Sequence, residues 1–175
     1  MRLLIILFFI STCALAQNQP LTNVANGQSV SIRDFKGASA VVIIFTSNVC
    51  AYDGYYTERL RSLFTQYSSK VQFLLVNSYL EAEETADKMR SKYDQWRFDV
   101  PYLADKDQTW MKTFGAKKSP EVFVLDGDLK TIYNGAIDDN PQLATAVKEN
   151  YLKKVLDGKI VPATRPIGCS IRPKQ

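Results

Sequence analysis

The order of two apolar runs around an amphipathic segment restricts the fold of this chain more than any other feature. AVVIIF (residues 40–45) and VQFLLV (residues 71–76) are apolar at odd and even positions alike, which is typical of strands covered on both faces of a sheet. From Tyr52 to Tyr67, between these runs, apolar residues recur at helical spacing. This strand, helix, strand order predicts two parallel strands joined by a right-handed crossover.

The next segments predict an early strand, two further helices and an antiparallel hairpin. Residues 29–35 (SVSIRDF) predict a short strand closed by Gly37, and residues 105–116 (DKDQTWMKTFGA) predict a short helix ended by Gly115. Residues 121–135 (EVFVLDGDLKTIYNG) predict a hairpin, because their central Asp-Gly-Asp is a strong turn signal. The apolar positions that mark a helix after the second buried strand are Ala82, Ala86, Met89 and Tyr93. We therefore expect an α/β fold, with a central mixed sheet flanked by helices and the hairpin at one edge.

The polar run Asp138-Asp139-Asn140 is interpreted as a turn that leads into the last helix. Asn140 can cap a helix that begins with Pro141 and runs to about Asp157. A site for a hard cation is the alternative, but adjacent oxygen side chains before a proline are more simply a turn and a helix cap. Residues 158–175, which contain several prolines and glycines, are expected to form an irregular tail.

The first 16 residues predict export. A basic start is followed by the apolar run LLIILFFI (residues 3–10), and Ala14-Leu15-Ala16 gives the small-x-small pattern of a signal-peptide cleavage site. The apolar run is far shorter than the roughly 20 residues that span a bilayer, so no stable membrane span is expected. Because Thr12 is bulky for a lipoprotein signal, lipidation of Cys13 is not expected. We predict a secreted or periplasmic protein with a signal peptide (1–16), one domain (17–157) and a tail (158–175).

The residue types that the chain lacks narrow its chemistry. The sequence has no histidine, which excludes Ser-His-Asp and Cys-His catalysis and metal sites that use imidazole. Neither GxxxxGK[ST] nor GxGxxG occurs, so nucleotide chemistry is not expected. The 22 Lys and Arg residues are scattered among 18 Asp and Glu residues, which argues against nucleic acid as a partner. We predict no metal and no other cofactor.

Two cysteines, Cys50 and Cys169, follow the predicted signal peptide, and an exported protein meets oxidising surroundings in which a disulfide persists. Cys50 lies between the first buried strand and the next helix, where reactive groups commonly lie in open α/β sheets. The start of a helix stabilises a thiolate, whereas Asp53, one turn further on, opposes it by like-charge repulsion. The alternative is that Cys50 is only a small buried residue.

Cys169 has the reach to contact Cys50. It lies 12 residues after Asp157, or about 40 Å of extended chain, and a compact domain of this length has a radius of gyration of only about 15 Å. Three interpretations of Cys169 stay open: a resolving thiol, half of a permanent structural bridge, or a thiol that pairs with another chain.

A further pattern, Ser119-Pro120 directly before the EVFVL strand, gives the chain a likeness to a known family. With the strand, cysteine, helix order, it resembles the thioredoxin superfamily, and most closely the peroxiredoxin-like redoxins of the alkyl hydroperoxide reductase and thiol-specific antioxidant type. The likeness covers roughly residues 30–172. It implies a thioredoxin-like fold in which Pro120 is cis and faces the reactive cysteine. The matching residues include Asn48-Val49-Cys50, Tyr52, Pro101-Tyr102-Leu103, Ser119-Pro120-Glu121 and Gly168-Cys169-Ser170-Ile171.

The chain departs from this family in its cysteine motif and in the residues before Cys50. Cys50-Ala51-Tyr52-Asp53 has no second thiol, unlike the C-x-x-C of thioredoxins. Ile43 and Ser47 stand where typical peroxiredoxins have Pro and Thr. Any partner sulfur for Cys50 must therefore come from elsewhere in the chain or from another molecule.

Our leading hypothesis is an exported thiol-dependent oxidoreductase. Cys50 would attack a peroxide or a protein disulfide, Cys169 would resolve the product, and an unidentified thiol donor would supply electrons. The residues expected to contact the substrate are Ser47, Asn48, Tyr52, Ser119 and Pro120. The competing hypothesis is a non-catalytic binding or structural module of the same fold, in which Cys50 and Cys169 form a stable bridge.

Overall fold

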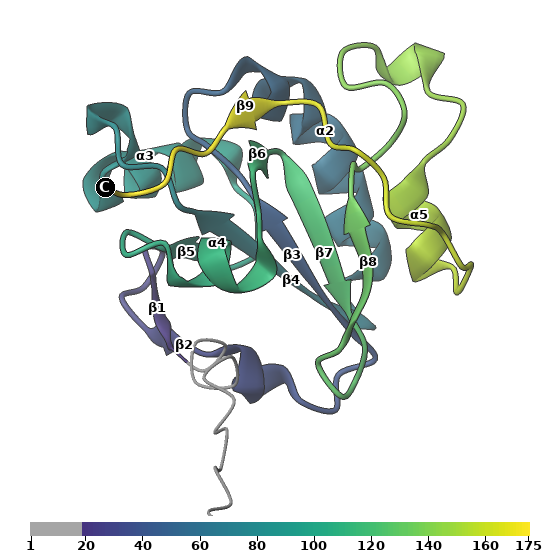
Figure 1. Cartoon of the computed structure of the whole chain (residues 1–175), viewed down its shortest axis with the longest axis horizontal. Helices are drawn as coiled ribbons and strands as arrows, with labels where there is room; N and C mark the ends of the chain where they lie inside the picture. Colours follow the sequence, from purple (N-terminus) through teal and green to yellow (C-terminus); the bar gives the residue numbers. More distant parts are fainter. Residues whose placement is uncertain (1–18) are drawn as a thin grey trace, which may run out of the picture.

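The computed structural model describes residues 19–175 and contains a mixed sheet that passes through the middle of the molecule (Figure 1). Its strand order is β2-β1-β5-β4-β3-β7-β8. The strands are β1 (Leu21–Asn23), β2 (Ser29–Val30), β3 (Ala40–Phe45), β4 (Val71–Asn77), β5 (Tyr102–Ala104), β7 (Glu121–Leu125) and β8 (Thr131–Gly135). The predicted α/β class and the hairpin at one edge, β7 with β8, are confirmed.

The two runs predicted as buried strands are adjacent and parallel at the centre of this sheet. β3 pairs with β4 from Ala40 opposite Val71 to Phe45 opposite Val76, and β7 pairs with the other edge of β3 in the antiparallel sense. Residues 41–45 are completely buried. Burying one such aliphatic side chain contributes roughly 1.5–3 kcal/mol, so this strand anchors the domain.

Alternate residues of β3 enter two hydrophobic clusters on opposite faces of the sheet. Val42 and Ile44 belong to the cluster that contains side chains of α2, α3 and α5, whereas Val41 and Ile43 belong to the cluster that contains side chains of α4. The helices are α2 (Ala51–Tyr67), α3 (Ala86–Trp96), α4 (Thr109–Phe114) and α5 (Tyr151–Leu156). The predicted helix between the buried strands, the one after them and the one ended by Gly115 are therefore confirmed.

The early strand is shorter than predicted. Only Ser29–Val30 is strand, and Ile32–Phe35 forms the 3-10 helix η1. The Ser31 hydroxyl accepts a hydrogen bond from the backbone N–H of Arg33, and the Asp34 carboxylate accepts one from the N–H of Ser31. This reciprocal capping box stabilises a helical turn where the apolar alternation alone indicates a strand.

The last helix begins ten residues later than predicted, because α5 spans Tyr151–Leu156 and Pro141 starts no helix. The Asn140 side chain does accept a hydrogen bond from the N–H of Leu143, as a turn residue would. Asp139 then closes a loop: its carboxylate accepts hydrogen bonds from the N–H groups of Lys148 and Glu149, and its own N–H donates to the carbonyl of Glu149. These bonds satisfy backbone groups that a continuous helix would otherwise pair.

Two short helical elements follow Asp139. The loop after Asp139 contains one 3-10 turn, η3 (Ala144–Ala146). α5 is then capped by Asn150, whose side chain accepts a hydrogen bond from the N–H of Lys153 at 2.8 Å. The polar residues at 138–140 thus form a turn, as predicted, but the helix cap belongs to Asn150.

The C-terminal tail follows an irregular path that is tied to the domain at several points. In Figure 1 the yellow tail leaves α5 and runs across the end of the sheet, past β6 (Lys118–Ser119). There the tail forms β9 (Cys169–Ser170), which pairs with β6 as a separate two-stranded sheet. Upstream of β9, the N–H of Thr164 donates to the carbonyl of Asn134.

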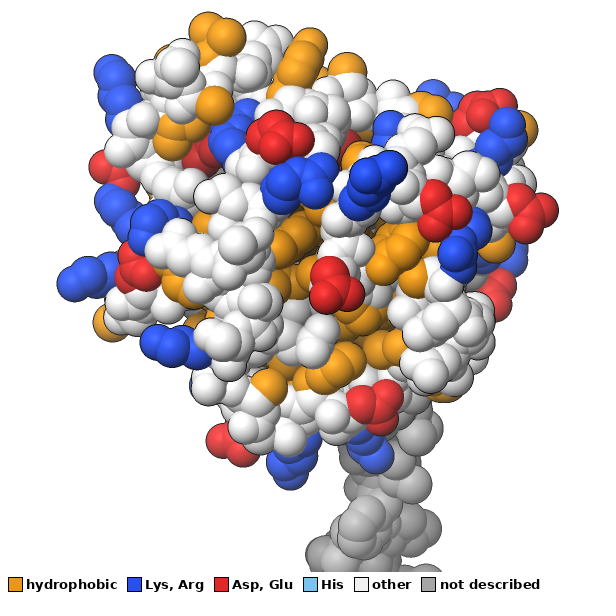
Figure 2. All heavy atoms as spheres, turned by 180° about the vertical axis from the view of Figure 1, so that it is seen from behind, with side chains coloured by type: hydrophobic (Ala, Val, Ile, Leu, Met, Phe, Trp, Pro, Cys, Tyr) orange, Lys and Arg blue, Asp and Glu red, His pale blue; other side chains and the backbone are white. Residues whose placement is uncertain are grey.

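The face of the molecule opposite to that seen in Figure 1 carries charges of both signs. Figure 2 shows apolar side chains in the hollows of that face, with basic and acidic side chains interspersed around them. In residues 19–175, no helix is both long and apolar enough to cross a bilayer. The predicted signal peptide lies outside the described residues.

Candidate functional site

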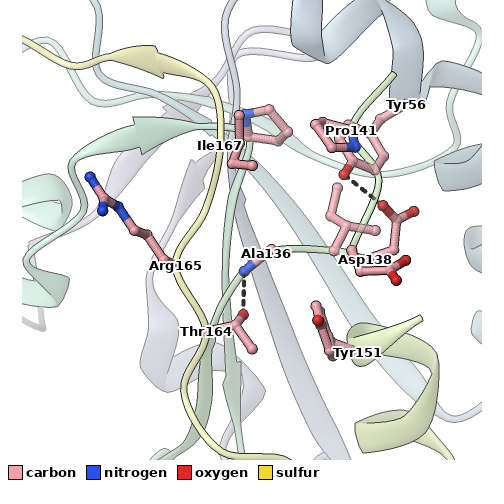
Figure 3. Close-up of a pocket in the computed structure, with 11 residues that line it drawn as sticks. Tyr56, Ala136, Asp138, Pro141, Tyr151, Thr164, Arg165 and Ile167 are labelled. Carbon is pink, nitrogen blue, oxygen red and sulfur yellow. Dashed lines mark hydrogen bonds between the residues drawn. The ribbon is translucent and has the colours of Figure 1, made fainter. Parts of the chain in front are cut away.

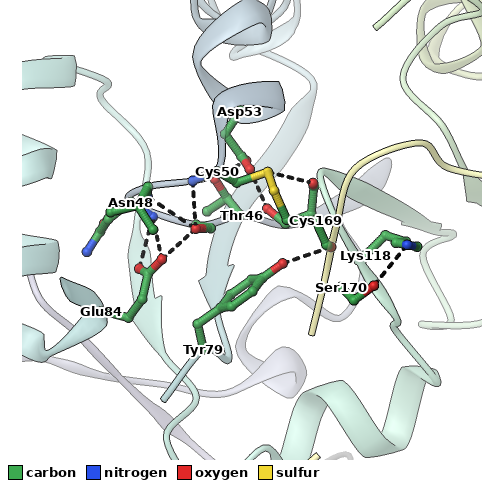
Figure 4. The surroundings of a disulfide bond; sticks show 12 residues. Thr46, Asn48, Cys50, Asp53, Tyr79, Glu84, Lys118, Cys169 and Ser170 are labelled. Atoms are coloured by element: carbon green, nitrogen blue, oxygen red, sulfur yellow. Dashed lines mark hydrogen bonds between the residues drawn. A yellow bond between two sulfur atoms is a disulfide. The ribbon is translucent and has the colours of Figure 1, made fainter. Parts of the chain in front are cut away.

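Cys50 and Cys169 form a disulfide within the chain (Figure 4). Cys50 is the N-cap residue of α2 and is buried, with 6% of its surface exposed, whereas the half-buried Cys169 belongs to β9. The interpretation of Cys169 as a thiol that pairs with another chain is therefore wrong. The structure brings together the two cysteines that the sequence proposed as attacking and resolving thiols.

The turn before Cys50 is organised by the hydroxyl of Ser47. This oxygen accepts hydrogen bonds from the backbone N–H groups of Val49 and Cys50, at 3.2 and 3.1 Å. The same hydroxyl donates to the carboxylate of Glu84 at 2.5 Å. Ser47 is buried, so its position shapes the loop that presents Cys50.

A buried carboxylate that the sequence analysis missed lies under this turn. Glu84 is 1% exposed and belongs to the 3-10 helix η2 (Ala82–Glu84). Besides Ser47, it accepts hydrogen bonds from the N–H of Asn48 and from the side-chain amide of Asn77. In the sequence it is one of three nearby glutamates, and nothing in their spacing distinguishes it from the exposed Glu81 and Glu83.

The polar network extends to the neighbouring strand ends. The Tyr102 hydroxyl donates to the side-chain oxygen of Asn48 at 2.9 Å, and the side-chain nitrogen of Asn48 donates to the carbonyl of Glu83. Lys106 donates to the side-chain oxygen of Asn77 at 2.9 Å, and burial lowers the pKa of this lysine to about 8. The side chain of Asn48, which we expected to contact substrate, is thus bonded within the protein.

Asp53 is buried directly behind the disulfide, with 4% of its surface exposed. Its carboxyl accepts hydrogen bonds from the hydroxyls of Thr46, at 2.6 Å, and of Ser119. Burial raises the pKa of Asp53 to about 7, although these hydrogen bonds act in the opposite direction. Asp53 therefore keeps its proton to a higher pH than an exposed aspartate, and below about pH 7 its repulsion of a Cys50 thiolate is weaker than the sequence suggests.

The loop of β6 lies against the sulfur of Cys50. The Ser119–Pro120 peptide bond is cis, as the family resemblance implied. The carbonyl oxygen of Ser119 lies 3.4 Å from Cys50 Sγ. No proton lies between these atoms in the disulfide, so this contact becomes a hydrogen bond only when Cys50 is a thiol. Ser119 also pairs with Cys169 across the β6–β9 ladder, so one residue contacts both halves of the disulfide.

Apolar side chains lie exposed on the segment around Cys50. Val49, immediately before the cysteine, is 62% exposed, and Tyr55 is 50% exposed. Tyr52 packs edge-to-face against Tyr55, with ring centroids 6.1 Å apart. Tyr52 is half-buried on the first turn of α2, and its contact with substrate stays a prediction.

Pro120 also contributes to the wall of a cavity of about 200 Å³, which Figure 3 shows. Its wall includes Tyr56 and Asp138, and the Tyr56 hydroxyl donates to the Asp138 carboxylate at 2.8 Å. Burial and the Asp138 charge raise the pKa of Tyr56 well above its usual value. Arg59 forms an ion pair with Asp138 at 2.5 Å and also donates to the carbonyl of Asn140. Asp138 is thus engaged in fixing the loop after β8 to α2.

A model of the Redoxin family matches residues 15–156. The chain belongs to the Redoxin family. The match ends at the last residue of α5, so β9 and Cys169 of this redoxin lie beyond it.

Individual relatives agree with this assignment. Thiol-disulfide oxidoreductase ResA from Bacillus thuringiensis subsp. konkukian (strain 97-27) is 26% identical over 129 residues, which are 74% of this chain and 70% of that protein. The crystal structure of an uncharacterized conserved protein from Geobacillus kaustophilus is 31% identical, with a TM-score of 0.79 and 90% of each chain covered.

The fold is shared more widely than the sequence. The thioredoxin domain of thiol-disulfide oxidoreductase BVU-2223 from Bacteroides vulgatus has a TM-score of 0.55 at 16% identity, over 64% of this chain and 79% of that one. The thioredoxin-like fold is confirmed, and the family assignment confirms the prediction of an oxidoreductase.

Proposed function

We propose that this redoxin is an exported thiol–disulfide oxidoreductase that uses Cys50 as its attacking thiol and Cys169 as its resolving thiol. The observation that carries the proposal is the Cys50–Cys169 disulfide, formed at the N-terminus of α2 and against the cis Ser119–Pro120 loop. Partners of this kind, a helix-start cysteine and a second cysteine in contact with it, are what a reversible dithiol–disulfide cycle needs.

The proposed cycle uses the two sulfurs in turn. In the reduced protein, the positive end of the α2 dipole stabilises the Cys50 thiolate. This thiolate attacks one sulfur of a substrate disulfide, a mixed disulfide forms, and the other substrate sulfur leaves as a thiolate. Cys169 then attacks Cys50 Sγ, which releases the reduced substrate and closes the Cys50–Cys169 bond. A thiol donor outside the chain reduces this bond again.

Disulfide exchange fits the site better than peroxide reduction. Peroxide reduction would give a sulfenic acid on Cys50, which Cys169 would condense to the same disulfide with loss of water. That reaction is favoured by donors aimed at the peroxide oxygens, but the Ser47 hydroxyl donates to Glu84. Arg59, on the same helix as Cys50, is engaged with Asp138.

The reduction potential separates a catalytic disulfide from a structural one. Structural disulfides of secreted proteins have potentials below about −300 mV. We expect the Cys50–Cys169 pair to equilibrate with dithiothreitol buffers at a higher potential, and the protein to accelerate reduction of a model protein disulfide by dithiothreitol. Cys50→Ala should abolish turnover, and Cys169→Ser should stop after one mixed disulfide. A potential below that of structural bridges, together with no turnover, would favour the non-catalytic module.

Export is the second part of the proposal and rests on the pattern at Ala14-Leu15-Ala16. Expression in a bacterial host, followed by fractionation and N-terminal sequencing, tests it. The expected product lies outside the cytoplasm and begins at Gln17. A product that keeps Met1 and stays in the cytoplasm would contradict export without affecting the redox assignment.

A further inference from the structure

The tail strand β9 covers Cys50 by pairing with β6, so the disulfide is not its only attachment. Cys169 lies opposite Ser119 and Ser170 opposite Lys118 in an antiparallel ladder. One residue further on, the N–H of Ile171 donates to the carbonyl of Lys117 at 3.0 Å. These bonds join main-chain atoms, so any extended polypeptide can form them in place of β9.

The residue before Cys169 has no room for a side chain. A Cβ atom built on Gly168 would lie 2.0 Å from the carbonyl oxygen of Ser119 and 2.6 Å from its carbonyl carbon. These are main-chain atoms of the cis Ser119–Pro120 loop, which cannot move aside as a flexible side chain would. A strand that follows the same path to Cys50 therefore needs glycine directly before its cysteine.

The side of β9 after the cysteine has its own requirements. Ile171, two residues beyond Cys169, is 6% exposed and belongs to the cluster that contains α4 side chains. The carbonyl of Cys169 accepts a hydrogen bond from the Tyr79 hydroxyl at 2.9 Å. In contrast, Ser170 is exposed, and its hydroxyl accepts a hydrogen bond from the Lys118 ammonium at 2.9 Å. The β6 site thus selects glycine, cysteine, any residue, then an aliphatic residue.

We propose that β9 occupies the binding site of the redox partner, and that the site accepts an extended segment of another protein with the pattern Gly-Cys-x-aliphatic. This inference rests on the proposed thiol–disulfide exchange and adds the identity of the partner segment. When the Cys50–Cys169 bond is reduced, β9 leaves β6 and the partner segment takes its place, with its cysteine sulfur beside Cys50. The return of β9 then displaces the partner, because the two strands compete for one edge.

The exchange step is balanced without an added oxidant. The Cys50 thiolate attacks the sulfur of a partner cysteine that is already in a disulfide, a new S–S bond forms, and the second sulfur of that disulfide leaves with the electron pair. As β9 returns, Cys169 attacks Cys50 and the partner cysteine leaves as a thiolate. The partner disulfide ends reduced and the Cys50–Cys169 pair ends oxidised.

A peptide that copies the tail tests this inference. The peptide Pro-Ile-Gly-Cys-Ser-Ile-Arg-Pro copies residues 166–173, and its cysteine carries thionitrobenzoate in a mixed disulfide. Release of coloured thionitrobenzoate measures attack by Cys50 in the reduced Cys169→Ser protein. Matched peptides replace the glycine by alanine, or the second isoleucine by aspartate. We expect each replacement to slow the reaction about tenfold or more.

A second variant tests the competition from the protein's side. Adding Gly168→Ala to Cys169→Ser removes the fit of the tail and should speed attack on the tail peptide several-fold. Adding Gly54→Ala is the matched control, because a Cβ at Gly54 meets no atom within 4 Å, and it should leave the rate unchanged. Circular dichroism establishes whether each variant is folded. If the double variant does not fold, the peptide series on Cys169→Ser alone decides whether strand exchange occurs.

The outcomes separate this inference from the proposed function. A small aromatic disulfide reagent measures the reactivity of Cys50 without strand pairing. If Cys50 reacts with that reagent but attacks all three peptides at the same rate, strand exchange is wrong and the proposed function stands. A Cys50 that reacts with neither would overturn both. If reduced wild-type protein and the peptide disulfide gave a disulfide-linked protein dimer, with both thionitrobenzoate and the free peptide thiol released, the site would belong to a second copy of the chain and the partner proposed here would be wrong.

Discussion

Replacing Asp53 by asparagine should remove a large pH dependence from the stability of this redoxin. Burial raises the pKa of Asp53 from 3.8 to about 7. Between these two pKa values, Asp53 has lost its proton in the unfolded chain but keeps it in the folded protein. The free energy of unfolding therefore falls by about 1.4 kcal/mol per pH unit between the two pKa values. Between about pH 5 and about pH 8 the loss from this one group is about 2.5 kcal/mol.

Asparagine at position 53 has nearly the same shape and no proton to lose. Its amide retains partners in the hydroxyls of Thr46 and Ser119, each of which can donate or accept. We expect Asp53→Asn to be more stable than the wild type at about pH 8, with the difference shrinking steadily towards about pH 5. Urea unfolding of the oxidised protein at a series of pH values measures this difference.

The matched control is Asp87→Asn, which makes the same substitution in the first turn of α3, where the aspartate is exposed. Its unfolding free energy should follow the wild type within about 0.5 kcal/mol at every pH. If the wild-type and Asp53→Asn curves run parallel over the whole range, Asp53 ionises in the folded protein as it does in the unfolded chain. The assignment of a buried, protonated carboxyl behind the disulfide would then be wrong.

Three further substitutions test other parts of the structure by equilibrium unfolding. Glu84→Ala leaves buried hydrogen-bond donors without an acceptor and should lower the free energy of unfolding by about 3 kcal/mol or more. The control Glu83→Ala changes an exposed neighbour and should lower it by less than about 0.5 kcal/mol. Equal effects would contradict the hydrogen-bond network under the Cys50 turn. Cys169→Ser removes a disulfide with a sequence separation of 119 residues and should lower the free energy of unfolding by about 4–5 kcal/mol relative to the oxidised wild type. A loss near zero would show that the disulfide does not restrict the unfolded chain. Gly135→Ala places a Cβ 2.3–2.8 Å from atoms of Thr164 in the tail, at a backbone φ of 142°, and should lower the free energy of unfolding by about 2 kcal/mol or more. Its control, Gly54→Ala, lies in a helix with open space beside it and should raise the free energy of unfolding by about 0.5–1 kcal/mol. A Gly135→Ala protein more stable than the wild type would contradict the path of the tail.

The centre of the fold could be predicted from sequence because its signals are local and repeated. Apolar residues at every position of 40–45 and 71–76 predict strands buried on both faces, and the structure places them side by side as β3 and β4. The position of Cys50 at the start of α2 follows from the order of these elements. That Pro120 is cis came from the family resemblance and not from any local pattern.

The errors occur where side chains capture backbone groups that regular structure would pair. Asp139 binds the N–H groups of Lys148 and Glu149, which lie nine and ten residues further along, so a loop replaces the start of the predicted last helix. No pattern of apolar residues reports such a contact. The same is true of Glu84, whose importance depends on its burial beneath Ser47 and Asn48, a tertiary property.

The pairing of Cys50 with Cys169 could not be derived from sequence either. Chain reach allowed the contact, but a residue in an irregular tail has many positions available within that reach. The structure selects one of them through β6–β9 pairing and the narrow space at Gly168. Neither feature is visible before the loop of β6 is placed next to the start of α2.

The N-cap of α2 has a practical consequence for the choice of substitutions at Cys50. Helices are usually capped by Ser, Thr, Asp or Asn, and losing such a cap costs about 1 kcal/mol. α2 begins with Cys50, whose side chain makes no capping hydrogen bond. This redoxin thus forgoes capping stability at the position of Cys50, the thiol proposed to attack the substrate. Serine, the customary inert replacement for cysteine, would restore a cap here and stabilise the reduced-like state, so alanine is the cleaner replacement at this position.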